Sequence, residues 1–100
     1  MKRDAMVIGT GDNVATALRN LDTGEHASVG ISKEIISIAI VEPVAYGHKF
    51  AIRDIAKGED ILKYGEIIGR ATADIASGAH VHIQNVESLR GRGDLERNKA

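Results

Sequence analysis

Short runs of β-branched and small apolar residues, separated by glycines, constrain this chain more than any other feature. The clearest runs are residues 35–41, 49–55, 66–73 and 79–86, and none of them sustains a helical period. Eleven glycines in 100 residues mark many of the breaks. This texture is typical of strands joined by tight turns, so we expect a compact, mainly β fold. Residues 35–41 are nearly all apolar, which predicts a central strand buried on both faces.

Residues 12–21 form the one segment with helical character. Asp12 or Asn13 can cap a helix, and Val14, Ala17 and Leu18 then follow at helical spacing. We therefore expect a helix of two to three turns here, and one or two short helices in the fold as a whole. Because a helix N-terminus attracts anions, the same residues are candidate substrate contacts.

An internal echo suggests that the domain repeats a structural unit. Residues 54–61 recur as residues 74–81 in the frame Asp-Ile-Ala-x-Gly-x-x-apolar, and residues 21–25 form a weaker copy. Two or three copies are too few for a solenoid. The echo favours similar turn-then-strand units folded back on one another, although chance similarity of glycine turns stays open.

Length and composition exclude several classes of protein. One hundred residues form one domain, and 13 basic against 14 acidic side chains draw the chain to neither nucleic acid nor membrane. The chain has no cysteine, three aromatic residues and no apolar run long enough for a membrane span. The first residues are too short and too acidic for a signal peptide, so we expect a cytoplasmic protein. Residues 1–87 form the expected domain, and residues 88–100 form a charged tail or linker.

Two histidines are the clearest candidates for chemistry. His80 and His82 flank Val81, so in a strand both imidazoles project from one face, with Gln84 continuing it. Val81 and Ile83 then project into the core. Such a pair can hold a divalent metal or an anionic substrate, or can simply be two surface histidines.

Two loops add basic and hydroxyl-bearing side chains. His48 and Lys49 follow Gly47 immediately before the run 49–55, where Phe50 and Ile52 alternate with outward-facing residues and leave one face of the strand wet. A lysine there suits a carboxylate or sulfonate, and a histidine can move a proton. Lys63 and Tyr64 offer a second such turn, although both loops are also consistent with solvated surface turns and Tyr64 with a core aromatic.

These motifs, taken in order, resemble a known enzyme family. Gly47-His48-Lys49-Phe50 is followed by Lys63-Tyr64-Gly65 and by His80-Val81-His82, and Asp12-Asn13 precedes them all. The set resembles the N-terminal domain of the altronate and galactarate dehydratase family, a compact SAF-type β-clip module. In that family the small domain accompanies a large dehydratase domain, either fused or as a separate chain, as it does in sulfolactate sulfo-lyase.

The resemblance implies a function that the chain alone would not perform. It implies β-elimination of water from altronate or galactarate, or of sulfite from sulfolactate, by a lyase that uses a divalent metal such as iron and a large subunit. His48, His80 and His82 are then candidate catalytic residues, with Asp12, Asn13, Lys49, Lys63 and Tyr64 as candidate substrate contacts. His80 and His82 are candidate metal ligands, although the large subunit could hold most of the metal's ligands. A non-catalytic sugar-acid-binding module is the alternative, and self-association stays open.

Overall fold

The computed structural model describes residues 3–9 and 11–88, which form two β-sheets and contain no helix. The strands are β1 (Ala5–Val7), β2 (Val14–Ala17), β3 (His26–Ile31), β4 (Glu34–Ala39), β5 (Lys49–Ala51), β6 (Asp60–Lys63), β7 (Glu66–Ala71), β8 (His80–Val81) and β9 (Val86–Ser88). The mainly β fold predicted from the sequence is therefore confirmed. The predicted tail lies outside the described residues, except for Ser88 at the end of β9.

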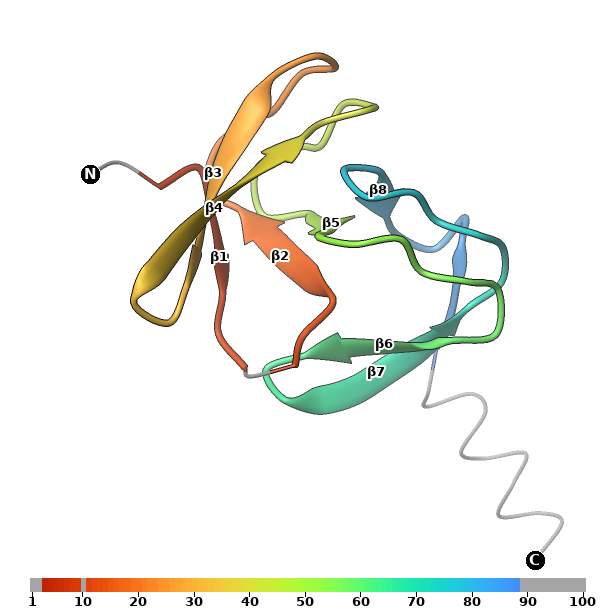
Figure 1. Cartoon of the computed structure of the whole chain (residues 1–100). Coiled ribbons are helices and arrows are strands. Elements are labelled where there is room, and N and C mark those ends of the chain that lie inside the picture. Colours follow the sequence, from red (N-terminus) through yellow and green to blue (C-terminus); the bar gives the residue numbers. More distant parts are fainter. Residues whose placement is uncertain (1–2, 10, 89–100) are drawn as a thin grey trace, which may run out of the picture.

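The larger sheet has six strands in the order β4-β3-β1-β2-β5-β8. Its pairs are antiparallel except β1 with β3, which run parallel. The smaller sheet has the order β6-β7-β9, and Figure 1 shows its β6–β7 hairpin reaching the loop between β1 and β2. No helix in this described part of the chain is long and apolar enough to cross a membrane.

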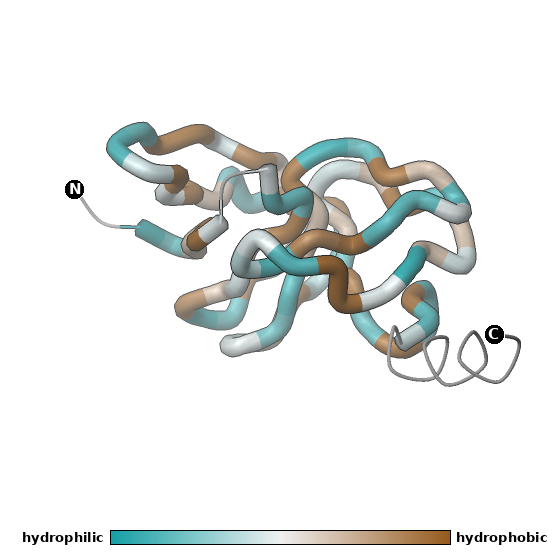
Figure 2. Tube along the Cα trace, turned by 90° about the horizontal axis from the view of Figure 1, so that it is seen from below, coloured by the Kyte–Doolittle hydropathy of each residue, from teal (hydrophilic) through white to brown (hydrophobic). Residues whose placement is uncertain are grey.

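The core consists of two apolar clusters that share β2 and β5. Ala15 and Phe50 pack into one cluster, while their neighbours Val14 and Ala51 pack into the other. Hydrophobic and hydrophilic stretches therefore alternate over short distances along the trace (Figure 2). The wet face predicted for the strand after Gly47 was wrong at Ala51, which is completely buried.

The helix predicted over residues 12–21 is absent, because this segment contains β2. Val14, Ala15 and Ala17 are all buried, since the strand lies between β1 and β5 with a core cluster on each face. A strand buried on both faces has no alternation, so its apolar positions also matched a helical spacing. The ladder hydrogen bonds to two neighbouring strands outweighed that local preference.

The strand predicted to be central, residues 35–41, is an edge strand. β4 pairs only with β3, and Ile35 and Val41 are exposed. Ile38 and Ile40 are buried, so the strand presents one apolar face to the core and the other to solvent. A nearly continuous apolar run therefore led to the wrong predicted position in the sheet.

The run 79–86 is not one strand but two short strands in different sheets. β8 ends at Val81, and Asn85 closes a turn before β9 by accepting a bond from the His82 N–H (3.0 Å) and donating one to the His80 carbonyl (2.8 Å). Ile83, which we expected in the core, is 84% exposed because it lies in this turn.

The internal echo corresponds to a repeated glycine turn that occurs four times in the described chain. In each turn the residue after the glycine donates its N–H to the carbonyl three residues earlier, at 2.9–3.1 Å. All four glycines have a positive φ of 82–92°, which costs glycine nothing. The turns span residues 21–25, 44–48, 55–59 and 75–79.

The four turns associate in two pairs. Leu21 forms an antiparallel bridge with Val44, and Ile55 forms one with Ile75. In the second pair, Asp54 accepts the N–H of Ser77 while Asp74 accepts that of Lys57, at 2.9 and 2.8 Å. The turn-then-strand repeat expected from the sequence is confirmed, with a fourth copy at residues 44–48.

Candidate functional site

Three histidines gather where the larger sheet ends at β5 and β8. His48 directly precedes β5, His80 opens β8, and His82 follows it. The two strands pair with Phe50 opposite His80 and Lys49 opposite Val81. His48 and His80 are each delivered by a glycine turn, so the repeated turn sets the position of both rings. We call His48, His80 and His82 the histidine triad.

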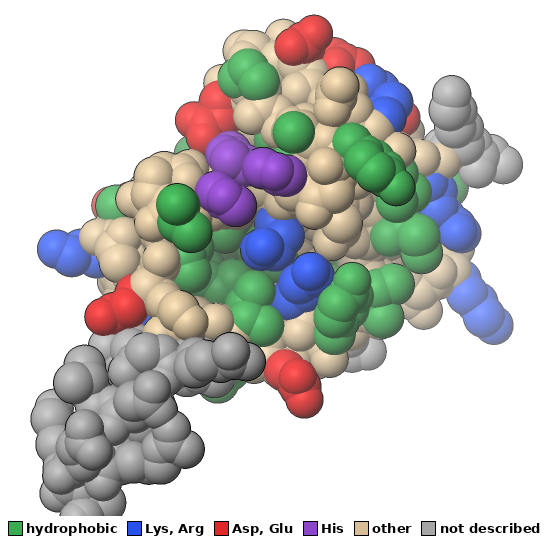
Figure 3. Space-filling view, turned by 180° about the vertical axis from the view of Figure 1, so that it is seen from behind, with side chains coloured by type: hydrophobic (Ala, Val, Ile, Leu, Met, Phe, Trp, Pro, Cys, Tyr) green, Lys and Arg blue, Asp and Glu red, His purple; other side chains and the backbone are tan. Residues whose placement is uncertain are grey.

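The three rings of the triad lie close together and nearly parallel. Their centroids lie 4.9–5.3 Å apart with interplanar angles of 16–20°. His48 Nδ1 lies 2.9 Å from His80 Nε2, so one ring donates and the other accepts. Each ring offers a nitrogen within 4.8 Å of the others, and all three side chains are half-buried. Figure 3 shows them as one cluster on the surface.

The surroundings of His80 favour its neutral form. Burial lowers the pKa of His80 first, and the nearby charges of His48, His82 and Lys49 lower it further, against an opposing effect of Glu42. The Glu42 carboxylate accepts the backbone N–H of His80 at 3.0 Å, which ties the start of β8 to the loop before the 44–48 turn. Neutral imidazole is the form that binds metal ions.

Glu42 and Asn85 position the triad, and sequence reasoning missed both. Asn85 holds the backbone of His80 and His82 through its two hydrogen bonds. Its place three residues after His82 is the only signal for this role, since an Asn commonly accepts a nearby N–H in a turn. Gln84 extends toward His80, but its 3.5 Å approach is too long for a strong hydrogen bond.

Two lysines continue the same surface. Lys49 is half-buried, and its pKa is lowered first by burial and then by the charge of Lys63. Neither lysine forms an ion pair with a described residue. Figure 3 shows basic side chains directly beside the histidine cluster. Two cations without ion pairs on one surface attract anions, so this surface is a candidate anion site.

A hollow of about 220 Å³ adjoins the triad and Lys49. His82 and Lys49 form its polar part, and the remaining walls are mostly apolar: Ile61, Ile68, Val81, Ile83, Val86 and Ser88. A small organic acid can therefore place its charged group near Lys49 and its carbon chain against apolar side chains.

The remaining predicted residues divide between this surface and the interior. Tyr64 is exposed, with the Lys63 amine 4.7 Å from the centre of its ring. Asp12 and Asn13 are buried and bond to backbone groups of the β6–β7 hairpin. The structure thus brings His48, His80, His82, Lys49 and Lys63 together, with Tyr64 at the margin, and keeps Asp12 and Asn13 beneath the hairpin.

These features define a small two-sheet β domain with a candidate metal site and a basic surface on one face. The model of the altronate/galactarate dehydratase SAF domain family matches residues 3–89, and the chain belongs to this family. The resemblance found from the ordered motifs is therefore confirmed.

The similar proteins include two altronate dehydratases and a sulfo-lyase subunit. Altronate dehydratase of Escherichia coli K12 is 48% identical over 77 residues, and that of Bacillus subtilis 168 is 36% identical over 77 residues. The alpha subunit of (2R)-sulfolactate sulfo-lyase from Chromohalobacter salexigens is 40% identical over 55 residues. The matches cover 77% of this chain but 15% of each dehydratase, and 55% of this chain and 58% of the sulfo-lyase subunit.

Proposed function

We propose that this chain is the small, substrate-side subunit of a sugar-acid dehydratase of the altronate/galactarate type. Together with a large subunit it would catalyse β-elimination of water from a hydroxy acid. The observation that carries the proposal is the histidine triad, whose ligand nitrogens lie within 4.8 Å of one another beside two unpaired lysines.

The triad fits a divalent metal. Metal–imidazole distances of about 2.1 Å require ligand nitrogens roughly 3–3.5 Å apart, so the three rings, whose nitrogens lie within 4.8 Å of one another, would close in slightly around the ion. Imidazole suits iron, zinc and other divalent first-row metals. We propose iron, held by His48, His80 and His82, with any remaining ligands from the substrate or the large chain. When bound, the metal would supply a Lewis acid for an oxygen of the substrate.

The two lysines would orient the acid. Elimination beside a carboxylate requires that the carboxylate be held while the neighbouring carbon loses a proton. Lys49 and Lys63 provide two cations for that carboxylate, and the apolar hollow beside Lys49 would exclude water from the carbon chain. Tyr64 would add a hydroxyl at the margin of this surface.

The large subunit would supply the groups that this chain lacks. Among the described residues, the group of possible metal ligands consists of these three histidines and includes no carboxylate. The chain also matches only 15% of the length of the altronate dehydratases. We therefore expect the base for the α-proton, or the acid for the leaving group, to come from the large chain.

A sulfolactate sulfo-lyase subunit is the second candidate. One similar protein is a separate alpha subunit of that enzyme, which matches the idea of a small chain working beside a large one. Lys49 and Lys63 could hold a sulfonate as readily as a carboxylate. The two candidates share the same site and differ in the leaving group.

Reconstitution tests the proposal. The full chain is combined with the large dehydratase-type chain of the same organism and ferrous iron, then assayed on altronate, galactarate and sulfolactate in parallel. We expect turnover of altronate or galactarate, and its loss when the metal is removed by a chelator. Turnover of sulfolactate alone would favour the second candidate. An intact complex that is silent on all three acids would exclude both, and acid binding without a partner chain would favour a binding module.

A further inference from the structure

Asp12 uses its whole carboxylate to hold the tip of the β6–β7 hairpin. Oδ1 accepts the N–H of Gly65 at 2.8 Å, and Oδ2 accepts the N–H of Tyr64 at 2.8 Å and that of Gly9 at 3.0 Å. The residue is only 7% exposed. Three N–H donors around one buried carboxylate leave it little capacity to bind a ligand as well.

Asn13 holds the same hairpin one step further from its tip. Its Oδ1 accepts the N–H of Leu62, and its Nδ2 donates to the carbonyl of Asp60, both at 2.8 Å. Asn13 is completely buried. Asp12 and Asn13 therefore act as a clamp from the β1–β2 loop onto the hairpin, rather than as a helix cap.

The clamped turn is strained at one residue. Tyr64 has a φ of 56°, a left-handed conformation that a bulky side chain rarely adopts, and Gly65 follows with a φ of 74°. The contact is also tight, because a Cβ on Gly9 would lie 2.2 Å from the Gly65 nitrogen. Such strain persists only where neighbouring groups hold it in place.

The strained turn carries a residue of the site. Lys63 immediately precedes Tyr64, and its amine lies 4.7 Å from the centre of the Tyr64 ring. Its charge also lowers the pKa of Lys49, which lines the hollow with His82. Two like charges repel, and no described carboxylate pairs with either of them. A flexible hairpin would therefore let Lys63 move away from Lys49 into solvent.

We infer that Asp12 is a positioning residue: by holding Tyr64 in its left-handed turn, it keeps Lys63 on the surface that it shares with Lys49, where both bind the acid group of the substrate. This inference rests on the proposed function and assigns Asp12 to the reaction without any contact with substrate. Asn13 reinforces it by fixing the strand that leads to Lys63.

The test uses the complex of the full chain with its large partner and ferrous iron, and compares Asp12→Asn with wild type. The amide offers one acceptor oxygen in place of two, so one turn N–H loses its partner. We expect KM for the acid to rise about ten- to hundredfold, since misplacing a binding group by about 1 Å has that effect. The kcat value and the affinity of the chain for ferrous iron should change less than about twofold.

Two further variants separate positioning from simple loss of stability. Glu59→Gln also removes a carboxylate that accepts a backbone N–H, but within the 55–59 turn, and should leave KM unchanged. Tyr64→Gly removes the strain, because glycine adopts the left-handed turn unaided. Asp12→Asn should therefore raise KM far less in the Tyr64→Gly background than in wild type.

The outcomes are distinct. An inactive wild-type complex would refute the proposed function, and the inference with it. An active complex in which Asp12→Asn lowers the melting temperature but leaves KM unchanged would refute the positioning role alone. So would an equal rise of KM in Glu59→Gln, or an equal effect of Asp12→Asn with and without Tyr64.

Discussion

The four glycine turns share one backbone geometry but differ in the residue that follows the glycine. In the turns 21–25 and 55–59, the residue after the glycine is a glutamate that pairs with an arginine six residues earlier. In the turns 44–48 and 75–79, the corresponding residues are His48 and Ala79, and no such ion pair forms. Each bridged pair of turns joins one of the first kind, an ion-paired turn, to one of the second, a site turn.

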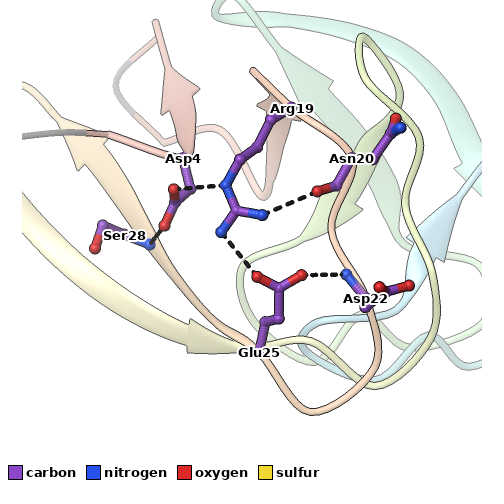
Figure 4. A network of polar contacts seen from close by, with 6 residues as sticks. All are labelled: Asp4, Arg19, Asn20, Asp22, Glu25 and Ser28. Carbon is purple, nitrogen blue, oxygen red and sulfur yellow. Dashed lines mark hydrogen bonds and ion pairs between the residues drawn. The ribbon is translucent and has the colours of Figure 1, made fainter.

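The ion-paired turns satisfy their own polar groups. Glu59 accepts the N–H of Ala56 at 2.8 Å and pairs with Arg53 at 3.1 Å. In the same way, Glu25 accepts the N–H of Asp22 at 2.6 Å and pairs with Arg19 at 2.8 Å (Figure 4). Because these side chains are used within their own turn, they leave nothing for a ligand.

The site turns instead place His48 and His80 on one surface. His48 ends one of these turns, and His80 follows the other by one residue. The pairing of β5 with β8 then brings the two rings together. A repeated unit thus forms ion pairs in two copies and places histidines of the candidate site in the other two.

The largest effect should come from adding a methyl group to the glycine of a site turn. A Cβ at Gly78 would lie 1.9 Å from the carbonyl oxygen of Ala39, whereas a Cβ at Gly58 would meet open space. Both glycines have positive φ. Gly58→Ala should cost about 1–2 kcal/mol of unfolding free energy from backbone strain alone, and Gly78→Ala roughly 3 kcal/mol or more because overpacking adds to it.

Urea denaturation of both variants measures the difference. We therefore expect the chain to tolerate the methyl group at Gly58 and not at Gly78. Equal losses of stability would show that the close approach of Gly78 to β4 contributes little.

The second effect concerns metal binding by the site turns. His80→Ala removes one of three ligands, so the affinity for cobalt(II), measured by calorimetry as a stable substitute for ferrous iron, should fall about a hundredfold or more. The melting temperature of the metal-free chain should change by no more than about 4 °C, since the ring is half-buried. His26→Ala is the control, because His26 is exposed at the start of β3. Equal affinities of His80→Ala and wild type would contradict the site.

The copies of the turn differ in how easily they can be recognised from the sequence. The echo between residues 54–61 and 74–81 was visible because both copies keep Asp-Ile-Ala before the glycine. The copy at residues 44–48 was missed because Pro43 stands where the other two copies have an aspartate, although Val44, Ala45 and Gly47 keep the frame. The contact of His48 with His80 depends on the pairing of β5 with β8, and strand pairing between distant segments is not encoded in local pattern.

The helix predicted at β2 and the central position predicted for β4 were wrong for a related reason. β2 and β4 are both apolar runs, but one is buried on both faces and the other lies at an edge. Hydrophobicity along a short strand does not reveal which neighbours it will have. Asp12 was judged as a helix cap for the same reason: its partners, Tyr64 and Gly65, lie more than fifty residues away.

The smallest effect should come from the ion-paired turns themselves. The pKa of Glu25 is lowered by its hydrogen bond with Arg19 first and by the N–H of Asp22 second, and the pKa of Glu59 by the N–H of Ala56 first and by Arg53 second. A carboxylate with a lowered pKa stabilises the fold above its ordinary value, and this contribution is lost as the pH falls through the lowered value. Glu25→Gln and Glu59→Gln should therefore lower the melting temperature near neutral pH and converge with wild type in acid.

Glu25→Gln should have the larger effect of the two. Arg19 also pairs with Asp4 at 3.0 Å, and Asp4 accepts the N–H of Ser28, so the first turn is linked to β3 (Figure 4). Arg53 has no comparable second carboxylate among the described ion pairs. Melting temperatures of the metal-free variants from about pH 7 to about pH 3 measure this order. Neither variant should alter cobalt(II) affinity, and a loss there would mean that the ion-paired turns also support the site.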